Sequence, residues 1–164
     1  MKNPSQSRLM FKLKVSAVVI NDDGKILMIK EKVEKNIRPL WNIIKGTYGD
    51  VANETIFEAI KRECQEEASI EIEIISTTGC YITNKNNEIN LQINFVAKCV
   101  KGEPAVAHLE KQFLRGECIS EIKWFTKEDI LSLGKREFIS EKIYTVVHDF
   151  LNGDQYSTSV FKPL

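Results

Sequence analysis

The sequence predicts a single α/β domain in which a mixed sheet packs between helices, as an α/β/α sandwich. Three observations support this prediction. A helical pattern at residues 55–68 lies between stretches rich in Val, Ile and Leu. Further helical patterns follow the last predicted strand. The chain has 164 residues, enough for one full core, and shows neither a repeat nor a low-complexity block.

The N-terminal part predicts a short tail followed by a β-hairpin. We assign residues 1–10 to the tail and residues 11–151 to the domain. Val, Ile and Leu dominate Phe11–Ile20, which favours a strand. The turn signal Asn21–Gly24 precedes a second strand-like run at Lys25–Lys30.

The residues before the central helix predict a glycine-containing loop. Gly46 and Gly49 interrupt the segment that follows Trp41. A tryptophan at this place favours the core over a role in stacking on a nucleobase. Lys45 beside Gly46 is a candidate phosphate ligand, because lysine presents a compact positive charge; a solvated lysine is the alternative.

The central helix is predicted from its cap and its periodicity. Thr55 and Glu58 have the spacing of a capping box, so the helix should begin there. Apolar residues then recur at helical spacing. They are Phe57, Ile60, Cys64 and Ala68. Glu63 and Glu67 fall beside this stripe on a helical wheel, so we expect both at the border of the core.

The remaining elements follow from alternation, breakers and caps. Strand-like runs are expected at Ile70–Ser76, 79–83, Leu91–Val100 and Ile119–Phe125. Residues 84–90 read as a turn, and residues 105–118 as a loop with a short helical turn. Thr126 should cap a short helix, and Glu137–Leu151 should form a longer one. Residues 152–164 are either a tail or a terminal strand.

An acidic cluster stands in the last turns of the central helix. Glu63, Glu66 and Glu67 share one helix face with Arg62 close by. Like charges at this spacing repel and destabilise a helix, so a cation that neutralises them is expected. Carboxylate clusters suit hard cations such as Mg²⁺, which bind through a few carboxylates and substrate phosphates. Solvation of an ordinary acidic helix face is the alternative.

The cluster resembles the signature of a known family. The run R-E-C-Q-E-E from Arg62, with Glu54 upstream, is similar to the Nudix box of the Nudix (MutT-like) hydrolases. That box reads G, five residues, E, seven residues, R-E-U-x-E-E-x-G-U, where U is bulky and apolar. Tyr48 and Ser69 stand where the box has its two glycines, and Cys64 is a weak match for U. The looser resemblance covers about residues 12–133 and implies a Nudix-like sandwich.

The resemblance also implies a site and an activity. It implies that Glu63, Glu66 and Glu67 bind a divalent metal, Mg²⁺ or Mn²⁺, and that Glu66, Glu63 and Arg62 serve catalysis. Arg62 would orient a glutamate. Lys45 and Gly46 would bind substrate, and a backbone carbonyl at Thr47 or Gly46 would reach the metal.

A glutamate from a later loop often assists in the resembled family. Glu110, Glu117 and Glu121 are the candidates here. We favour Glu117 as a catalytic residue because it precedes the strand that leads to Trp124. An ordinary exposed glutamate is the alternative for each of them.

The function expected from these residues is metal-dependent hydrolysis of a diphosphate linkage in a nucleoside diphosphate derivative. A non-catalytic nucleotide or nucleotide-sugar sensor on the same fold is the first alternative. A plain interaction domain with an acidic helix is the second. The run after the box matches none of the substrate signatures sought: Asn86 stands where ADP-ribose-type members have Pro and dinucleoside-polyphosphate types have Tyr. The substrate therefore stays open.

Composition excludes several other classes. The 23 basic and 23 acidic residues balance, which gives no broad electrostatic footprint for a nucleic-acid polymer. No apolar run predicts a membrane span or signal peptide. Four cysteines without a C-x-x-C pair and two isolated histidines argue against zinc and against a disulfide framework. We therefore expect a cytoplasmic protein that acts on a small molecule; a homodimer is left open.

Overall fold

The computed structural model describes residues 9–163, and its centre is a seven-stranded sheet. The strands are β1 (Met10–Ile20), β2 (Ile26–Glu31), β3 (Leu40–Asn42), β4 (Ile44–Thr47), β5 (Glu71–Lys85), β6 (Glu88–Lys101) and β7 (Ile119–Phe125). The helices are α1 (Ile56–Ala68), α2 (Leu109–Arg115), α3 (Lys127–Ser132) and α4 (Glu141–Leu151), with 3₁₀ turns η1 (Lys135–Glu137) and η2 (Thr158–Val160).

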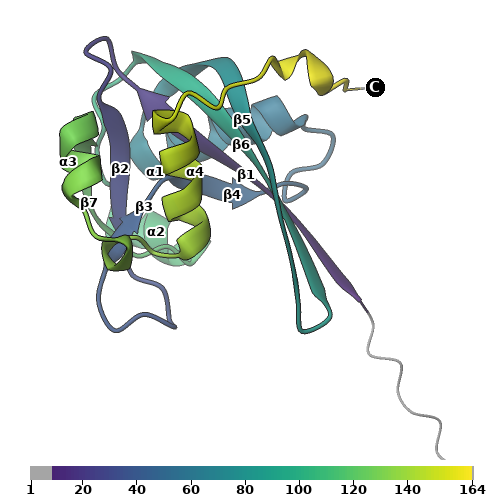
Figure 1. The fold of residues 1–164 in the computed structure, drawn as a ribbon. Coiled ribbons are helices and arrows are strands. Elements are labelled where there is room, and N and C mark those ends of the chain that lie inside the picture. Colours follow the sequence, from purple (N-terminus) through teal and green to yellow (C-terminus); the bar gives the residue numbers. More distant parts are fainter. Residues whose placement is uncertain (1–8, 164) are drawn as a thin grey trace, which may run out of the picture.

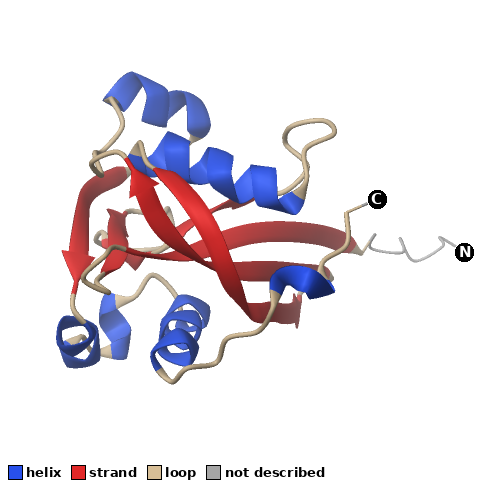
Figure 2. Cartoon of the chain, turned by 90° about the horizontal axis from the view of Figure 1, so that it is seen from above, coloured by secondary structure: helices blue, strands red, loops and turns tan. Residues whose placement is uncertain are grey.

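The sheet is mixed, as predicted. Its strands lie in the order β3-β2-β1-β6-β5, with β4 pairing with β1 and β7 pairing with β2. The long strands β1 and β6 run parallel, whereas the other pairs are antiparallel. Helices cover both faces of the sheet, α1 on one side and α4 on the other (Figures 1 and 2). The α/β/α sandwich expected from the sequence is therefore confirmed.

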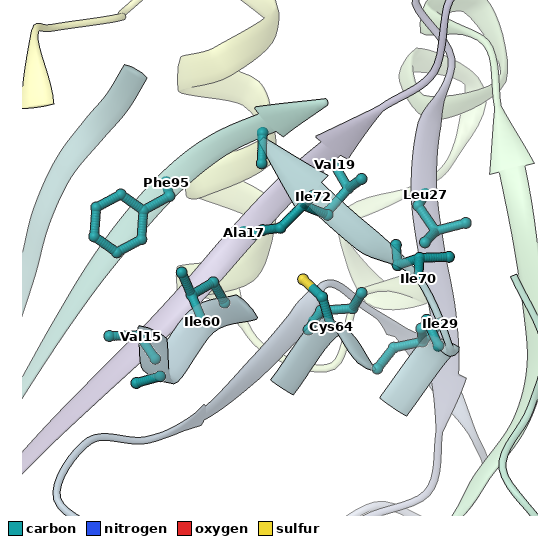
Figure 3. Close-up of a cluster of buried hydrophobic side chains, with 14 of the residues drawn as sticks. Val15, Ala17, Val19, Leu27, Ile29, Ile60, Cys64, Ile70, Ile72 and Phe95 are labelled. Carbon is teal, nitrogen blue, oxygen red and sulfur yellow. The ribbon is translucent and has the colours of Figure 1, made fainter. Parts of the chain in front are cut away.

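One core fills the space between α1 and the sheet. The helix contributes Ile60, Cys64 and Ala68, all fully buried. They pack against alternate residues of the two strands opposite, including Val15 and Ala17 of β1 and Leu27 of β2 (Figure 3). The predicted apolar stripe of the helix is thus its buried face.

The second core lies between the sheet and α4. Val18 of β1 and Met28 of β2 point to this face, since successive strand side chains alternate sides. Ile143 and Val147 of α4 pack on them. Trp41 also belongs to this core, with its ring edge-on to Phe125 at 4.7 Å between centroids. The core role expected for this tryptophan is confirmed.

Strands β5 and β6 are longer than predicted. Residues 79–85 continue β5 without a break, so the turn expected over 84–90 shrinks to Asn86 and Asn87. Both asparagines have positive φ, which a tight hairpin turn requires. The two strands form an arm beside β1 that projects from the body (Figure 1).

The last helix starts later than predicted. Ser140 caps α4 by accepting a hydrogen bond from the Ile143 amide, so the helix begins at Glu141 rather than Glu137. Glu137 ends the 3₁₀ turn η1, and Phe138 and Ile139 are extended; the Ile139 amide donates to the Trp41 carbonyl at 2.8 Å. Ile139, which lies within the predicted helix, is buried from this extended segment instead.

The structure also describes part of the segments at the two ends of the chain. The predicted N-terminal tail falls outside the described residues except for Leu9 and Met10, and Met10 already begins β1. After α4, Tyr156 makes a single antiparallel bridge with Thr77. Phe161 then packs on Phe57 and Phe95, on the α1 side. No helix within residues 9–163 has the length and apolar character needed to cross a membrane.

Candidate active site

Helix α1 positions the acidic residues by two local signals. The Thr55 hydroxyl accepts from the Glu58 amide while the Glu58 carboxylate accepts from the Thr55 amide, which is the predicted capping box. Ser69 ends the helix in the left-handed conformation, with φ of 59°. On the opposite side of this helix from the core, Glu58, Lys61 and Gln65 are exposed.

Arg62 connects three carboxylates. Its Nε and one terminal nitrogen donate to the two oxygens of Glu54, at 3.0 and 2.8 Å. Its other terminal nitrogen donates to Glu63 at 2.6 Å and to Glu66 at 3.4 Å. The bond to Glu54 raises the pKa of the guanidinium further above its usual value. A bidentate pair of this kind fixes the side-chain geometry. Arg62 therefore holds the carboxylates in place.

Glu63 is nearly buried against strand β4. Gly46 lies so close to its carboxylate that a Cβ on residue 46 would overlap it. Burial raises the pKa of Glu63, the charge and hydrogen bond of Arg62 lower it, and the charges of Glu66 and Glu117 raise it again. Gly46, predicted in a loop as a substrate ligand, thus lies in a strand and leaves room for this side chain.

Glu67 is the most confined carboxylate of the cluster. It is 5 % exposed, and its Oε2 accepts from the Lys45 backbone amide at 3.4 Å, a long contact. Burial raises its pKa well above the usual value, and the charge of Lys45 opposes this shift. Three neighbouring carboxylates raise the pKa further: Glu31, Glu63 and Glu117.

The structure brings Glu117 to the helix and leaves the other two candidates apart. Arg115 makes a bidentate pair with Glu117, at 2.7 and 3.0 Å, and also donates to the Glu66 carbonyl at 2.8 Å. Glu110 is exposed on α2. Glu121 is exposed on β7 and pairs with Lys30 at 3.7 Å. Of the three, Glu117 is the one whose charge acts on both Glu63 and Glu67.

Glu31 and Asn42 are two site residues that the sequence reasoning missed. The Glu31 Oε2 accepts from the Asn42 amide at 2.6 Å and lies 3.4 Å from the Lys45 ammonium. Its charge acts on Glu67. Glu31 ends β2, where no local motif marks it. Only the pairing of β2 with β3, which sets Glu31 opposite Leu40, brings it to the site.

The two departures from the glycine pattern are both accommodated. The Tyr48 amide donates to the Leu13 carbonyl at 3.0 Å, and its side chain packs on the α1-side core. Ser69 adopts the positive φ that a glycine would adopt more easily, and its amide donates to the Cys64 and Gln65 carbonyls. With both residues in place, α1 runs unbroken from Ile56 to Ala68.

The residues of this site suit a hard divalent cation. In the part of the chain that the structure describes, no group of three His, Cys, Asp or Glu side chains is already arranged as a set of metal ligands. The carboxylates around Glu67 are nonetheless confined, mutually repelling and all-oxygen, and Lys45 compensates them incompletely. Cations such as Mg²⁺ bind through carboxylates of this kind. The chemistry of these side chains therefore suits a hard cation, although three of them are not gathered around one point in the described residues.

Comparison with known proteins identifies the family of this chain. The family model for the NUDIX domain matches residues 10–147. A NUDIX hydrolase from Nitrosomonas europaea superposes with a TM-score of 0.74 at 21% identity, over 93% of this chain and 97% of that one.

Two other similar structures share the same fold. The MutT protein of Methanosarcina mazei Go1 has a TM-score of 0.65 at 17% identity, over 92% of this chain and 96% of its own. The NUDIX domain of Shewanella oneidensis NrtR, complexed with ADP ribose, has a TM-score of 0.66 at 14% identity, over 93% of each chain. No curated protein sequence matches this chain. Because the NUDIX model spans most of the chain and the box residues are arranged around one helix, the protein belongs to the NUDIX family of hydrolases.

Proposed function

We propose that this protein is a metal-dependent pyrophosphohydrolase that cleaves a diphosphate linkage in a nucleoside diphosphate derivative. The observation that carries the proposal is the confinement of Glu67. A nearly buried carboxylate with three carboxylate neighbours is costly unless a cation offsets it. The Nudix family generally uses divalent metals and acts on small nucleotide-type substrates, which supports the same conclusion.

The residues that would hold the metal are Glu63, Glu66 and Glu67. When bound, Mg²⁺ or Mn²⁺ would polarise a phosphoryl oxygen, lower the pKa of a bound water and offset the charge of the diphosphate. Arg62 holds Glu54, Glu63 and Glu66 by charge-assisted bonds, so their carboxylates stay in a fixed geometry. A carbonyl of Gly46 or Thr47 would add an oxygen ligand.

Glu117 would serve as the acid–base residue of the later loop. Its carboxylate lies within electrostatic reach of Glu63 and Glu67 and is held by Arg115. A positioned carboxylate near a reacting water can accept its proton. Because Arg115 also binds the Glu66 carbonyl, it ties this loop to the end of α1.

The second candidate function is non-catalytic sensing of a nucleotide. Tyr48 and Ser69, in place of two box glycines, are the observations in its favour. The bidentate Arg62–Glu54 pair supports catalysis, because a reacting group has to be held in a fixed geometry. Under either function, the compound that binds would be a small molecule in the cytoplasm.

One experiment separates the two functions. Nucleoside triphosphates, nucleotide sugars and dinucleotides are incubated with the protein and Mg²⁺ or Mn²⁺, and phosphate or pyrophosphate release is measured beside binding. We expect metal-dependent hydrolysis of at least one diphosphate compound and its loss in excess EDTA. Tight binding without turnover would establish the sensor instead, and hydrolysis that survives EDTA would exclude the metal.

A further inference from the structure

A lysine-lined cavity adjoins the acidic site on the α4 side of the sheet. Its volume is about 720 Å³, within the range of small-molecule sites. Five lysines line it, from β1, β4, the β2–β3 loop, the β5–β6 arm and α4: Lys14, Lys35, Lys45, Lys85 and Lys142. A cavity with this charge attracts anions.

Two of these lysines are partly buried and lack an ion-pair partner. Within residues 9–163, Lys45 is the one lining lysine with a carboxylate at salt-bridge distance, and of the other four only Lys14 and Lys142 are partly buried. Burial lowers the pKa of both ammonium groups. The charge of Lys45 lowers both pKa values as well, and Lys14 acts on Lys142. Glu31 and Glu88 offset only part of the effect on Lys14. Mutually repelling, half-buried ammonium groups are stabilised by an anion between them.

The other walls do not neutralise this charge. Among the described residues that line the cavity, Glu141 is the one acid, and it is already ion-paired with Lys135. The neighbouring polar lining residues, Asn90 and Gln92, are uncharged. Helix α4 also begins at this wall, and its N-terminus adds partial positive charge. The cavity therefore keeps a net positive charge.

Lys45 connects this cavity to the carboxylates. In β4 its side chain lies on the cavity side, 3.4 Å from Glu31, while its backbone amide donates to Glu67 at 3.4 Å. The next residue, Gly46, faces Glu63 on the α1 side. Lys45 is therefore the residue that the cavity shares with the acidic site, and a further phosphate of a substrate bound at the acidic site would meet the cavity at this lysine.

We propose that the substrate carries at least one further phosphate group beyond the scissile diphosphate, bound between Lys14, Lys45 and Lys142. This inference rests on the proposed hydrolysis and specifies its substrate class as polyphosphorylated compounds. A cluster of three ammonium groups fits a phosphate because several charge-assisted hydrogen bonds form together. A compound with a neutral distal group would leave the lysines without a counter-charge.

The first test measures binding without catalysis. Calorimetry in EDTA compares inorganic tripolyphosphate with pyrophosphate, and NADP with NAD, which differ by one phosphate. We expect the ligand with the extra phosphate to bind about tenfold more tightly. Lys14→Gln and Lys142→Gln should each abolish most of this preference. Lys61→Gln, an exposed lysine on α1 outside the cavity, is the matched control and should preserve it.

A folding readout separates lost binding from lost structure. Each cavity variant removes a repelled charge, so its melting temperature without ligand should equal or exceed that of the parent. Loss of the preference with an unchanged or raised melting temperature supports the proposal. A parent that binds both members of each pair equally, or variants that keep the preference, would overturn it.

The hydrolysis experiment decides the proposed function separately. A lysine-dependent phosphate preference without hydrolysis of any diphosphate compound would leave the cavity as an anion site and refute the enzyme. Hydrolysis whose kcat/KM is the same for compounds with and without the extra phosphate, in parent and cavity variants alike, would keep the enzyme and refute the cavity's role.

Discussion

Gly46 and Glu63 are in such close contact that any side chain at position 46 would occupy the space of the Glu63 carboxylate. The φ of Gly46 is not positive, so its backbone conformation does not require glycine. The glycine is required because the strand and the helix approach each other at the carboxylate. A residue that resembles a loop glycine in the sequence thus determines the position of a proposed metal ligand.

We predict that Gly46→Ala lowers kcat/KM by about 100-fold, because displacement of a catalytic group by about 1 Å has effects of this size. Gly134→Ala is the matched control. Gly134 has a negative φ and open space around it, so its substitution should leave activity and stability nearly unchanged. Turnover and thermal melting of both variants provide the measurement. Parental turnover in Gly46→Ala would show that Glu63 can move without consequence.

Arg62 provides a second test, because it holds three carboxylates at once. Removing it in Arg62→Ala leaves Glu54 and Glu63 nearly buried without their cation, since each carboxylate is 8% exposed. We expect a loss of about 2 kcal/mol in the free energy of unfolding. Turnover should fall as well. Arg62→Lys should recover part of the stability but little of the turnover, because lysine cannot form the bidentate pair.

The control for Arg62 is an exposed ion pair. Lys101 and Glu71 are 2.7 Å apart with side chains 74% and 56% exposed, so Lys101→Ala should change stability by less than about 0.5 kcal/mol. Urea unfolding of the three variants measures the difference. If Arg62→Ala and Lys101→Ala lose equally small amounts of unfolding free energy, the ion pairs of Arg62 contribute no more to stability than an exposed surface pair.

Ser69 stands where the Nudix box has a glycine, and its substitution tests this difference without changing any glutamate. Its φ of 59° lies in the left-handed region, which is unfavourable for serine and easy for glycine. Ser69→Gly should therefore stabilise the protein by about 0.5–1 kcal/mol and leave kcat unchanged. Ser69→Ala, which keeps a Cβ, should give no gain. A rise in kcat in Ser69→Gly would instead mean that this serine distorts the site.

Local signals explain which parts of the fold could be predicted. The start of α1 follows from the Thr55–Glu58 pair, and its buried face follows from the apolar period, so both are confirmed by the structure. The start of α4 could not be predicted in this way. Phe138 and Ile139 fit a helical pattern, but they lie extended beside Trp41, a partner distant in sequence.

The same distinction between local and long-range signals holds for the residues of the candidate site. Glu63 and Glu67 share a helix, so their common face was visible in the spacing. Glu31 and Asn42 reach the site only because β2 pairs with β3 in the sheet. The structure gives Gly46 a different place, since the residue that approaches it, Glu63, lies 17 residues further along the chain.

Glu67→Gln tests the metal site most directly. Burial and three neighbouring carboxylates raise the pKa of Glu67 in the folded protein above its unfolded value. For an acid with a raised pKa, the folded state is favoured below the unfolded pKa, about 4.3, and this contribution is lost as pH rises through the folded pKa. Without metal, the variant should therefore be more stable than the parent at neutral pH, by about 0.5 kcal/mol or more, with a difference that shrinks toward pH 4.

With Mg²⁺ the order should reverse. The parent gains stability because the cation binds the folded state, whereas Glu67→Gln gains less and loses turnover by about 100-fold or more. Glu73→Gln, an exposed glutamate on β5, is the control and should follow the parent throughout. Melting curves between pH 4 and pH 8, with and without Mg²⁺, measure the effect. The variant lacks the carboxylate of Glu67. If it nevertheless keeps both the parental turnover and the parental rise in melting temperature with Mg²⁺, this carboxylate does not bind the metal.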